Sequence, residues 1–358
     1  MEMVKGLVYV TDTDKGYFRK KAGKGFYYID EKNEKITDGK ILTRIKNLKI
    51  PPMWQEVWIC SKANGHLQAT GKDQRRRKQY LYHEKWAQHR NTNKFKRIPE
   101  FAKALPKIRN VSLQDMNSKG WAKDKVLGLV VQFLNEAFIR IGNIYYREQN
   151  QTYGLTTLRR KHLHIEGSNM SFQYKAKSGK YRNISIKNKK ISRLIAQCSE
   201  LPGYEIFRYY DEGEKSWNCI DSHDVNEYLR KITGEQFSSK DFRTWGGTVL
   251  AVEKYEEAKK EVLQNNRKSL VPTLIKMVSE KLGNTVAICR EYYIHPAVLS
   301  AVENEKIDEY KKGINKKYAK FKDSLSVSEL IALSIIETVE KETSRKGSII
   351  SVPKEVAV

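Results

Sequence analysis

The pattern of apolar and polar positions predicts strands in the first part of the chain. Short runs of aromatic and β-branched residues, bounded by turn residues, lie at 25–29, 56–60, 66–70 and 78–82. Asn64-Gly65 lies between two of these runs and predicts a hairpin turn in which both residues have positive φ. Residues 41–46 predict a short helix that ends before Pro51-Pro52.

The pattern changes near residue 105. Apolar side chains recur at helical spacing over 121–141, with Arg140 near the end of the predicted helix. Four strands are then expected, at 156–158, 162–165, 171–174 and 183–186, the last pairing back across the turn 177–180. From residue 191 onward the period is helical. Ser326 and Glu329 have the spacing of a capping box that opens a helix at 330–339.

These patterns predict an α+β protein with two domains. We expect a small β-rich N-terminal domain at residues 1–104 and a larger, mostly helical domain with a small β-sheet at 105–343. A linker near 100–110 would join them. Residues 344–358 are polar without periodicity and are expected to form a flexible tail.

Charge indicates the class of partner. Lys and Arg number 67 against 42 Asp and Glu, a formal net charge of +25. Residues 1–104 hold 24 basic and 11 acidic residues, so 24 − 11 = +13 of that charge lies in under a third of the chain. Such a balance is typical of proteins that bind nucleic acid, although a generic cationic surface remains an alternative on charge alone.

Other classes of protein are disfavoured. No stretch reaches the roughly 20 apolar residues of a membrane helix, and the N-terminus lacks the pattern of a secretory signal. We therefore expect a cytoplasmic protein without a membrane partner. The four cysteines are scattered, with no CxxC pair and no histidine at zinc spacing, so neither a zinc site nor a disulfide framework is expected.

Cleavage of a nucleic-acid strand needs a nucleophile, charge compensation at the phosphoryl oxygens and a proton for the leaving oxygen. Many nucleases use two metal ions held by clustered carboxylates, and the sequence has no such acidic motif. A metal-free alternative uses arginines as phosphate clamps, a lysine as the acid and a tyrosine as the nucleophile. That set needs no metal and no small-molecule cofactor.

Six motifs lie along the chain, and all but the first contain such arginines, lysines or tyrosines. They are Gly65-His-Leu-Gln-Ala-Thr-Gly71, Arg77-Lys-Gln-Tyr80 with Tyr82-His83, Phe138-Ile-Arg140-Ile-Gly-Asn143 with Tyr153-Gly-Leu-Thr-Thr-Leu158 and His162, Lys175-Ala-Lys177-Ser-Gly-Lys180, Asp241-Phe-Arg243-Thr-Trp-Gly246, and Leu282-Gly-Asn284-Thr285 with Cys289-Arg290 and Tyr293-Ile-His-Pro296. Each motif alone is weak. In this order they resemble the type IB DNA topoisomerases, in the bacterial and poxvirus branch of that family.

The resemblance implies a fold like that of tyrosine recombinases and type IB topoisomerases, with the larger domain catalytic. It also implies an activity: relaxation of supercoiled DNA by transient cleavage of one strand through a 3′-phosphotyrosyl bond, without ATP or metal. The implied catalytic residues are Tyr293, Arg140, Lys177, Arg243 and Asn284. One active site suffices for this reaction, so a monomer is expected. Since the implied substrate is DNA, we also expect association with the nucleoid.

Each candidate also has a structural interpretation. Arg140 at a helix end would stabilise the helix dipole, and a lysine in a hairpin turn is commonly solvated. The resemblance favours Lys177 over Lys180 as the acid and Tyr293 over Tyr292 as the nucleophile. Many family members carry histidine where this chain has Asn284; asparagine still donates a hydrogen bond to a phosphate but carries no charge.

Further residues are candidates for DNA binding. Arg76, Arg77 and Lys78 form a basic run that would bind phosphates. The resemblance implies DNA contacts by Gln79, Tyr80 and Tyr82 near the cleavage site. Asn143 and Tyr146 follow Arg140 closely and are further candidates.

Two rival functions remain open. A tyrosine recombinase would use the same chemistry, but recombinases usually have His-x-x-Arg at the second arginine, where this chain has Lys240-Asp-Phe-Arg243. A non-catalytic DNA-binding protein of the same fold would explain the charge equally well. It would bind DNA without forming a covalent adduct.

Overall fold

The computed structural model describes residues 4–23, 25–74, 76, 78–167, 169–265 and 267–346. The chain folds into two compact units, Met1–Lys96 and Arg97–Val358. Helix α3 (Ile98–Met116) begins the second unit and contains both the 104/105 division and the whole of the linker, near 100–110, that the sequence suggested. Its apolar face is buried from its first turn, so these residues are part of the second unit's core.

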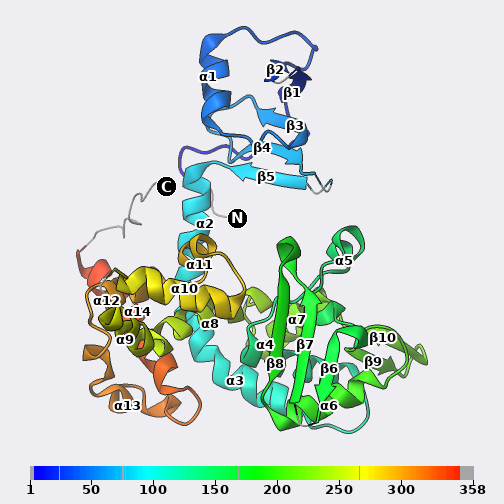
Figure 1. Ribbon diagram of the computed structural model, residues 1–358, viewed down its shortest axis with the longest axis vertical. Coiled ribbons are helices and arrows are strands. Elements are labelled where there is room, and N and C mark those ends of the chain that lie inside the picture. The colour runs from blue at the N-terminus through cyan, green and yellow to red at the C-terminus, as the bar shows by residue number, and fades with distance from the viewer. Residues whose placement is uncertain are drawn as a thin grey trace. The chain divides into compact units, whose positions relative to one another are not determined.

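The first unit contains an antiparallel sheet (Figure 1). Its strands, in the spatial order β2-β1-β3-β4-β5, are Gly25–Ile29, Gly16–Ala22, Gln55–Cys60, Leu67–Lys72 and Lys78–Tyr82. Four of these strands were predicted. β1 was not, because three consecutive cations, Arg19 to Lys21, interrupt its apolar pattern.

Two helices complete the first unit, α1 (Gly39–Asn47) and α2 (Glu84–Lys96). The predicted helix at 41–46 is confirmed as part of α1, which begins where Asp38 accepts hydrogen bonds from two backbone N–H groups. Ile45 of α1 packs on the sheet against Val57, Ile59 and Ala69. This small core holds the sheet together.

The expected conformation of Asn64-Gly65 is wrong. These residues do lie in the connection between β3 and β4, but neither has positive φ. The connection spans more residues than a two-residue turn, so its backbone has no need of that conformation. Gly65 is required for space, because a Cβ there would lie 2.6 Å from the Cys60 Sγ.

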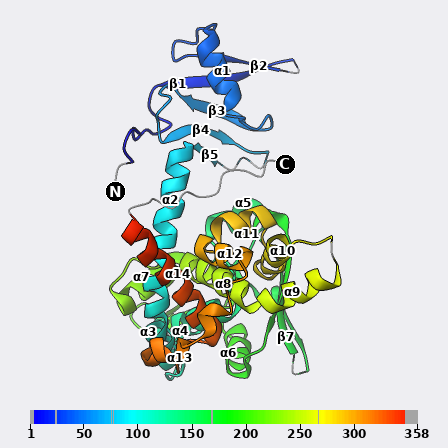
Figure 2. The ribbon, with the colours of Figure 1, turned by 90° about the vertical axis from the view of Figure 1, so that its left-hand side faces the viewer.

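The second unit is mostly helical, and α8 packs against α3, α4, α7, α9, α10, α12 and α14 (Figures 1 and 2). After α3 they are α4 (Lys123–Ala137), α5 (Ile144–Asn150), α6 (Lys189–Ser199), α7 (Ser222–Thr233), α8 (Ser239–Glu253), α9 (Tyr255–Gln264), α10 (Leu270–Leu282), α11 (Val286–Tyr292), α12 (Pro296–Glu303), α13 (Ile314–Lys317) and α14 (Val327–Lys346). Every residue of α8 from Asp241 to Val252 is buried, so this helix is the centre of the core.

Helix α4 ends earlier than expected. The prediction extended it to residue 141, but Phe138 adopts the left-handed conformation, with φ of 48°, and ends the helix. Arg140 therefore lies beyond the helix, in a segment without regular secondary structure. The alternative role for Arg140 at a helix end does not apply.

Two small sheets lie in the second unit. β6 (Leu163–Glu166), β7 (Asn169–Lys175) and β8 (Tyr181–Ile186) form an antiparallel sheet, close to the predicted strands. β9 (Arg208–Asp211) and β10 (Ser216–Cys219) form a hairpin that was not predicted. The strand expected at 156–158 is wrong: a 3₁₀ helix, Leu155–Thr157, is found there, closed by Thr157 on the backbone of Gly154.

The last helix confirms the capping box. Ser326 N donates to Glu329 Oε2 at 2.8 Å, and Glu329 N donates to Ser326 Oγ at 3.2 Å. Helix α14 continues through Lys346, so residues 344–346, predicted as part of the tail, are helical. The rest of that predicted tail lies outside the described residues. Further 3₁₀ turns are Arg160–His162, Lys177–Gly179, Glu309–Lys311 and Ala319–Phe321.

Candidate active site

Arg140 is held by its backbone. Its carbonyl oxygen accepts a hydrogen bond from Leu155 N at 2.8 Å. Gly154 permits this contact, because a Cβ there would lie 2.6 Å from the Arg140 oxygen. The half-buried guanidinium donates to the side-chain oxygen of Asn284. The segment after α4 thus fixes a cation next to residues from the C-terminal helices.

Arg243 enters the same site from α8. Its guanidinium donates to the carbonyl oxygens of Phe138 and, at 3.0 Å, Leu282. The side chain is only 4% exposed. Burial and the nearby charge of Arg140 lower the pKa of Arg243 to about 10, so it stays protonated at neutral pH. Its Nε is a buried donor with no partner among the described residues.

Asn284 lies between the two arginines. Its Oδ1 accepts from Arg140 and, at 3.4 Å, from Arg243. Because guanidinium groups only donate, they fix which side of the amide is oxygen. The buried Nδ2 is left without a partner among the described residues. Asn284 therefore presents a donor suited to an anionic oxygen.

Tyr293 follows helix α11 directly. The guanidinium carbon of Arg243 lies 5.1 Å from the centre of its ring. Burial alone would raise the pKa of the phenol, but the charges of Arg243 and Arg140, a hydrogen bond from Arg243 and the charge of Lys177 lower it below its ordinary value. The site therefore favours the phenolate. Its neighbour Tyr292 is also half-buried.

Lys177 lies in the turn between β7 and β8. Ser178 and Gly179 both have positive φ, which makes the turn tight. The side chain is exposed, and its charge acts on the Tyr293 phenol. Lys180, the alternative lysine, instead donates to the backbone oxygen of Asn284 at 3.2 Å. The structure thus separates the environments of the two lysines.

All five candidate catalytic residues lie in the second unit. Arg140, Arg243, Asn284 and Tyr293 form one connected cluster, and Lys177 stands close enough to influence it. Cations, an amide donor and a phenol are the kinds of group that a metal-free attack on a phosphodiester requires. Among the described residues, no group of three or more His, Cys, Asp or Glu is arranged to hold a metal ion.

Two residues near this site, Tyr174 and Arg182, were not anticipated. Tyr174 is buried, and the charges of Arg182, Arg243 and Arg140 act on its phenol, although burial raises its pKa to about 12. Arg182 lies opposite Tyr174 on β8. No local pattern marks these two residues, because only the pairing of β7 with β8 brings them to the site.

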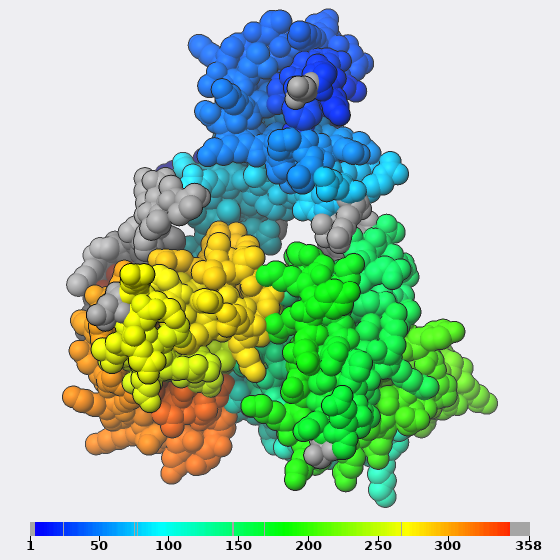
Figure 3. Space-filling model, in the orientation of Figure 1, coloured from blue at the N-terminus to red at the C-terminus, as the bar shows by residue number. Residues whose placement is uncertain are grey.

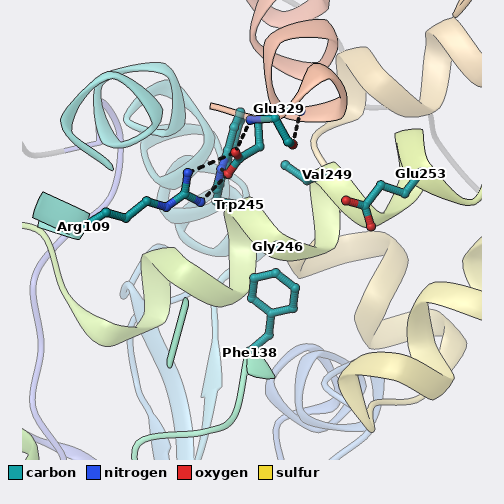
Figure 4. Close-up of a pocket in the computed structure, with 8 residues that line it drawn as sticks. Arg109, Phe138, Trp245, Gly246, Val249, Glu253 and Glu329 are labelled. Atoms are coloured by element: carbon teal, nitrogen blue, oxygen red, sulfur yellow. Dashed lines mark hydrogen bonds and ion pairs between the residues drawn. The ribbon is translucent and has the colours of Figure 1, made fainter. Parts of the chain in front are cut away.

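Two glycines of α8 make room for the site. A Cβ at Gly246 would lie 2.4 Å from the Phe138 ring, and a Cβ at Gly247 would lie 2.5 Å from the backbone carbonyl oxygen of Tyr293. Gly246 also lines a cavity of about 320 Å³, with Phe138 as a wall (Figure 4). On its far side Arg109 forms an ion pair with Glu329 at 2.6 Å. The Phe138 ring thus contacts α8 from the cavity side, while its carbonyl holds Arg243.

The candidate DNA contacts of the first unit divide between two faces of β5. Tyr80 and Tyr82 share one face, with ring centres 6.0 Å apart and nearly parallel. Lys78 shares that face by strand alternation and pairs with Asp12 at 2.5 Å. Gln79 lies on the other face, where its amide donates to Asp73 at 3.0 Å. The structure therefore groups Lys78 with the two tyrosines and separates Gln79 from them.

The remaining candidates are placed as follows. Arg76 is exposed and has positive φ, whereas Arg77 lies outside the described residues. Asn143 is exposed immediately before α5. Tyr146 lies within α5, but its side chain is outside the described part of the structure. Within the residues described, no helix is long and apolar enough to span a membrane.

Comparisons with known proteins agree with this chemistry. A family model described as the catalytic core of eukaryotic DNA topoisomerase I matches residues 83–321, and one described as the N-terminal domain of bacterial DNA topoisomerase IB matches residues 25–73. The chain is 31% identical over 296 residues to DNA topoisomerase 1B of Acanthamoeba polyphaga mimivirus, covering 81% of this chain and 88% of that protein. It is 24% identical over 297 residues to DNA topoisomerase 1B of Vaccinia virus (strain Copenhagen), covering 80% and 89%.

Proposed function

Because this chain belongs to the type IB DNA topoisomerases, we propose that Tyr293 is the nucleophile that cleaves one DNA strand. Its phenolate oxygen attacks the phosphorus, forms a 3′-phosphotyrosyl bond and releases a 5′ hydroxyl. The lowered pKa of Tyr293 supports this role, because a larger fraction of the phenol is ionised at neutral pH.

Arg140 and Arg243 stabilise the charge that develops on the phosphoryl oxygens. Both are cations held in place before substrate binds, so they need little reorganisation during the reaction. Asn284 adds a hydrogen bond from its Nδ2, which faces no acceptor among the described residues. The Nε of Arg243 is a second donor of this kind.

Lys177 donates the proton that the departing 5′ oxygen needs. Its position in an exposed turn suits a residue that must reach a leaving group on bound DNA. In religation the 5′ hydroxyl attacks the phosphotyrosyl bond, Lys177 takes the proton back, and Tyr293 leaves. The phosphotyrosyl bond conserves the energy of the phosphodiester, so strand rotation and resealing need neither ATP nor a metal ion.

The observation that carries this proposal is the convergence of Arg140, Arg243, Asn284 and Tyr293 from three segments that lie far apart in the sequence. The test is relaxation of negatively supercoiled plasmid by the full chain in EDTA without ATP. Wild type and Tyr292→Phe should relax the plasmid and form a covalent adduct, while Tyr293→Phe should do neither. Relaxation by Tyr293→Phe would overturn the assignment.

The partner is DNA, and the finer features are part of the proposal. Double-stranded DNA would contact Lys78, Tyr80 and Tyr82, which share one face of β5, as well as Arg76, Arg77, Gln79, Asn143 and Tyr146. One complete site per chain supports action as a monomer, which sedimentation on and off DNA would test. The net charge of +25 supports association with the nucleoid in the cytoplasm, which crosslinking in cells would test.

A further inference from the structure

The C-terminal end of α10 is an anchoring point beside the active site. The last four carbonyl groups of a helix have no partner within the helix, and here all four accept hydrogen bonds. Two of the donors are arginines from distant segments. The pairs are Asn284 N with Ser279 O at 3.0 Å, Arg182 Nη1 with Glu280 O at 3.1 Å, Arg182 Nη2 with Lys281 O at 2.8 Å, and Arg243 Nη2 with Leu282 O at 3.0 Å.

Arg182 fits this helix end closely. Its planar guanidinium bonds two successive carbonyls, a geometry that lysine cannot reproduce. Gly283, with φ of 65°, lies directly beside it, and a Cβ there would be 2.3 Å from Arg182 Nη1. The positive charge also meets the negative end of the helix dipole. Burial lowers the pKa of Arg182, yet it remains a cation at neutral pH.

The same arginine belongs to the hairpin that carries Lys177. Arg182 pairs with Tyr174 across β7 and β8, a few residues from the turn. Within the turn, Lys180 Nζ donates to the backbone oxygen of Asn284 at 3.2 Å. The part of the second unit that contains β6, β7 and β8 lies beside the part that contains the C-terminal helices (Figure 3). Two cations of the hairpin thus bind the segment that ends in Asn284.

We propose that Arg182 is a positioning residue for strand cleavage, which fastens the β7–β8 hairpin to the end of α10 and so sets where Lys177 can deliver its proton. The inference rests on the proposed role of Lys177 as the acid. Lys177 is exposed in a turn, and Arg182 and Lys180 join the hairpin that carries it to the end of α10 and to Asn284. A general acid must come within hydrogen-bond reach of its target. The anchored strand supplies that restraint.

A substrate whose leaving group needs no acid can distinguish this positioning role from a general effect of the substitution on folding. In a substrate with sulfur in place of the bridging 5′ oxygen, the P–S bond breaks and the electron pair leaves as a thiolate. Thiols have a pKa of about 8.5 in free cysteine, so the thiolate leaves without a proton. Loss of a correctly placed acid therefore slows cleavage of the oxygen substrate and spares the sulfur substrate.

The experiment measures single-turnover cleavage by the full chain at saturating enzyme, on a duplex first mapped for a cleavage site. The cleavage rate of Lys177→Ala should fall about 10²- to 10⁴-fold on the oxygen substrate, and most of this loss should disappear on the sulfur substrate. The cleavage rate of Arg182→Ala should fall about 10- to 100-fold on the oxygen substrate, and most of this loss should also disappear on the sulfur substrate. Arg182→Lys keeps the charge, covers the case in which the alanine variant fails to fold, and should show the same pattern. Arg193→Ala, an exposed arginine on α6, is the matched control and should match wild type on both.

The outcomes separate the two proposals. If sulfur does not restore Lys177→Ala, Lys177 is not the acid, and the proposed function loses that step. If sulfur restores Lys177→Ala but leaves the folded Arg182 variants as slow as on oxygen, Arg182 does not act through Lys177. Wild-type rates for the Arg182 variants on oxygen would also overturn the inference.

Discussion

The guanidinium of Arg243, in α8, lies 5.1 Å from the centre of the ring of Tyr293, which directly follows α11. Arg243 is buried and bonded to the carbonyls of Phe138 and Leu282, so its position is set by the backbone of two other segments. A buried cation next to a phenol favours the phenolate. This pair therefore links the packing of the second unit to the reactivity of Tyr293.

The charge of Arg140 should control the pH at which the tyrosine reacts. Arg140→Gln replaces the guanidinium that donates to Asn284 with a neutral amide, so one of the cations that lower the pKa of Tyr293 is lost. The pKa of Tyr293 should rise, so the ascending limb of the pH–rate curve for single-turnover cleavage should move to higher pH. Arg193→Gln should leave the curve in place. A slower reaction with an unmoved curve would contradict this account of Tyr293.

The orientation of the Asn284 amide predicts opposite effects for two substitutions. Asn284→Asp still accepts from both arginines, but it places a negative charge where Nδ2 would donate to the phosphate. Cleavage should fall about 10²- to 10³-fold, as for loss of an oxyanion donor. Asn284→His retains a donor and should stay active. Single-turnover cleavage measures both, and an aspartate variant as fast as wild type would rule out the proposed donor.

Close packing of α8 against Tyr293, the proposed nucleophile, predicts an effect of one added methyl group. In Gly247→Ala the new Cβ would lie 2.5 Å from the backbone oxygen of Tyr293, so this backbone must shift. A displacement of about 1 Å can cost about 10²-fold in rate, and we expect cleavage to fall while DNA binding is retained. Gly39→Ala, at the start of α1 with open space around it, is the control. Cleavage at the wild-type rate in Gly247→Ala would show that the position of Tyr293 tolerates the shift.

His295 should make stability fall in acid. It caps α12 by accepting from Ala297 N at 3.1 Å, and burial lowers its pKa to about 4. The unfolded state, with a histidine pKa of about 6.5, binds the proton first. Stability should therefore decrease as pH falls through about 6.5 and level off below about 4, by at most roughly 3 kcal/mol from this residue.

The matched variant for this effect is His295→Asn. Asparagine can still cap the helix but does not titrate. Its Tm should depend less on pH between about 4 and 6.5 than that of wild type, while His162, whose pKa is also lowered to about 4, keeps its own contribution. An equal pH dependence of Tm in both proteins would exclude His295 as a source.

Local patterns in the sequence determined much of the secondary structure. Aromatic and β-branched alternation predicted the strands at 25–29 and 78–82, and the capping box at Ser326 predicted the start of α14. These features depend on residues near one another in the chain. The order of the motifs also identified the family, because a motif can be read from its residues in the sequence without knowing how the chain folds.

Only the tertiary structure decided how the candidate residues meet. The left-handed Phe138 takes Arg140 out of a helix, and Asn284 becomes the shared acceptor of two arginines. Arg182 donates hydrogen bonds to the end of α10, a contact that no sequence motif predicts. The physical reason is that local preferences act over a few residues, whereas a buried guanidinium is stabilised by whichever carbonyls the folded chain brings within reach.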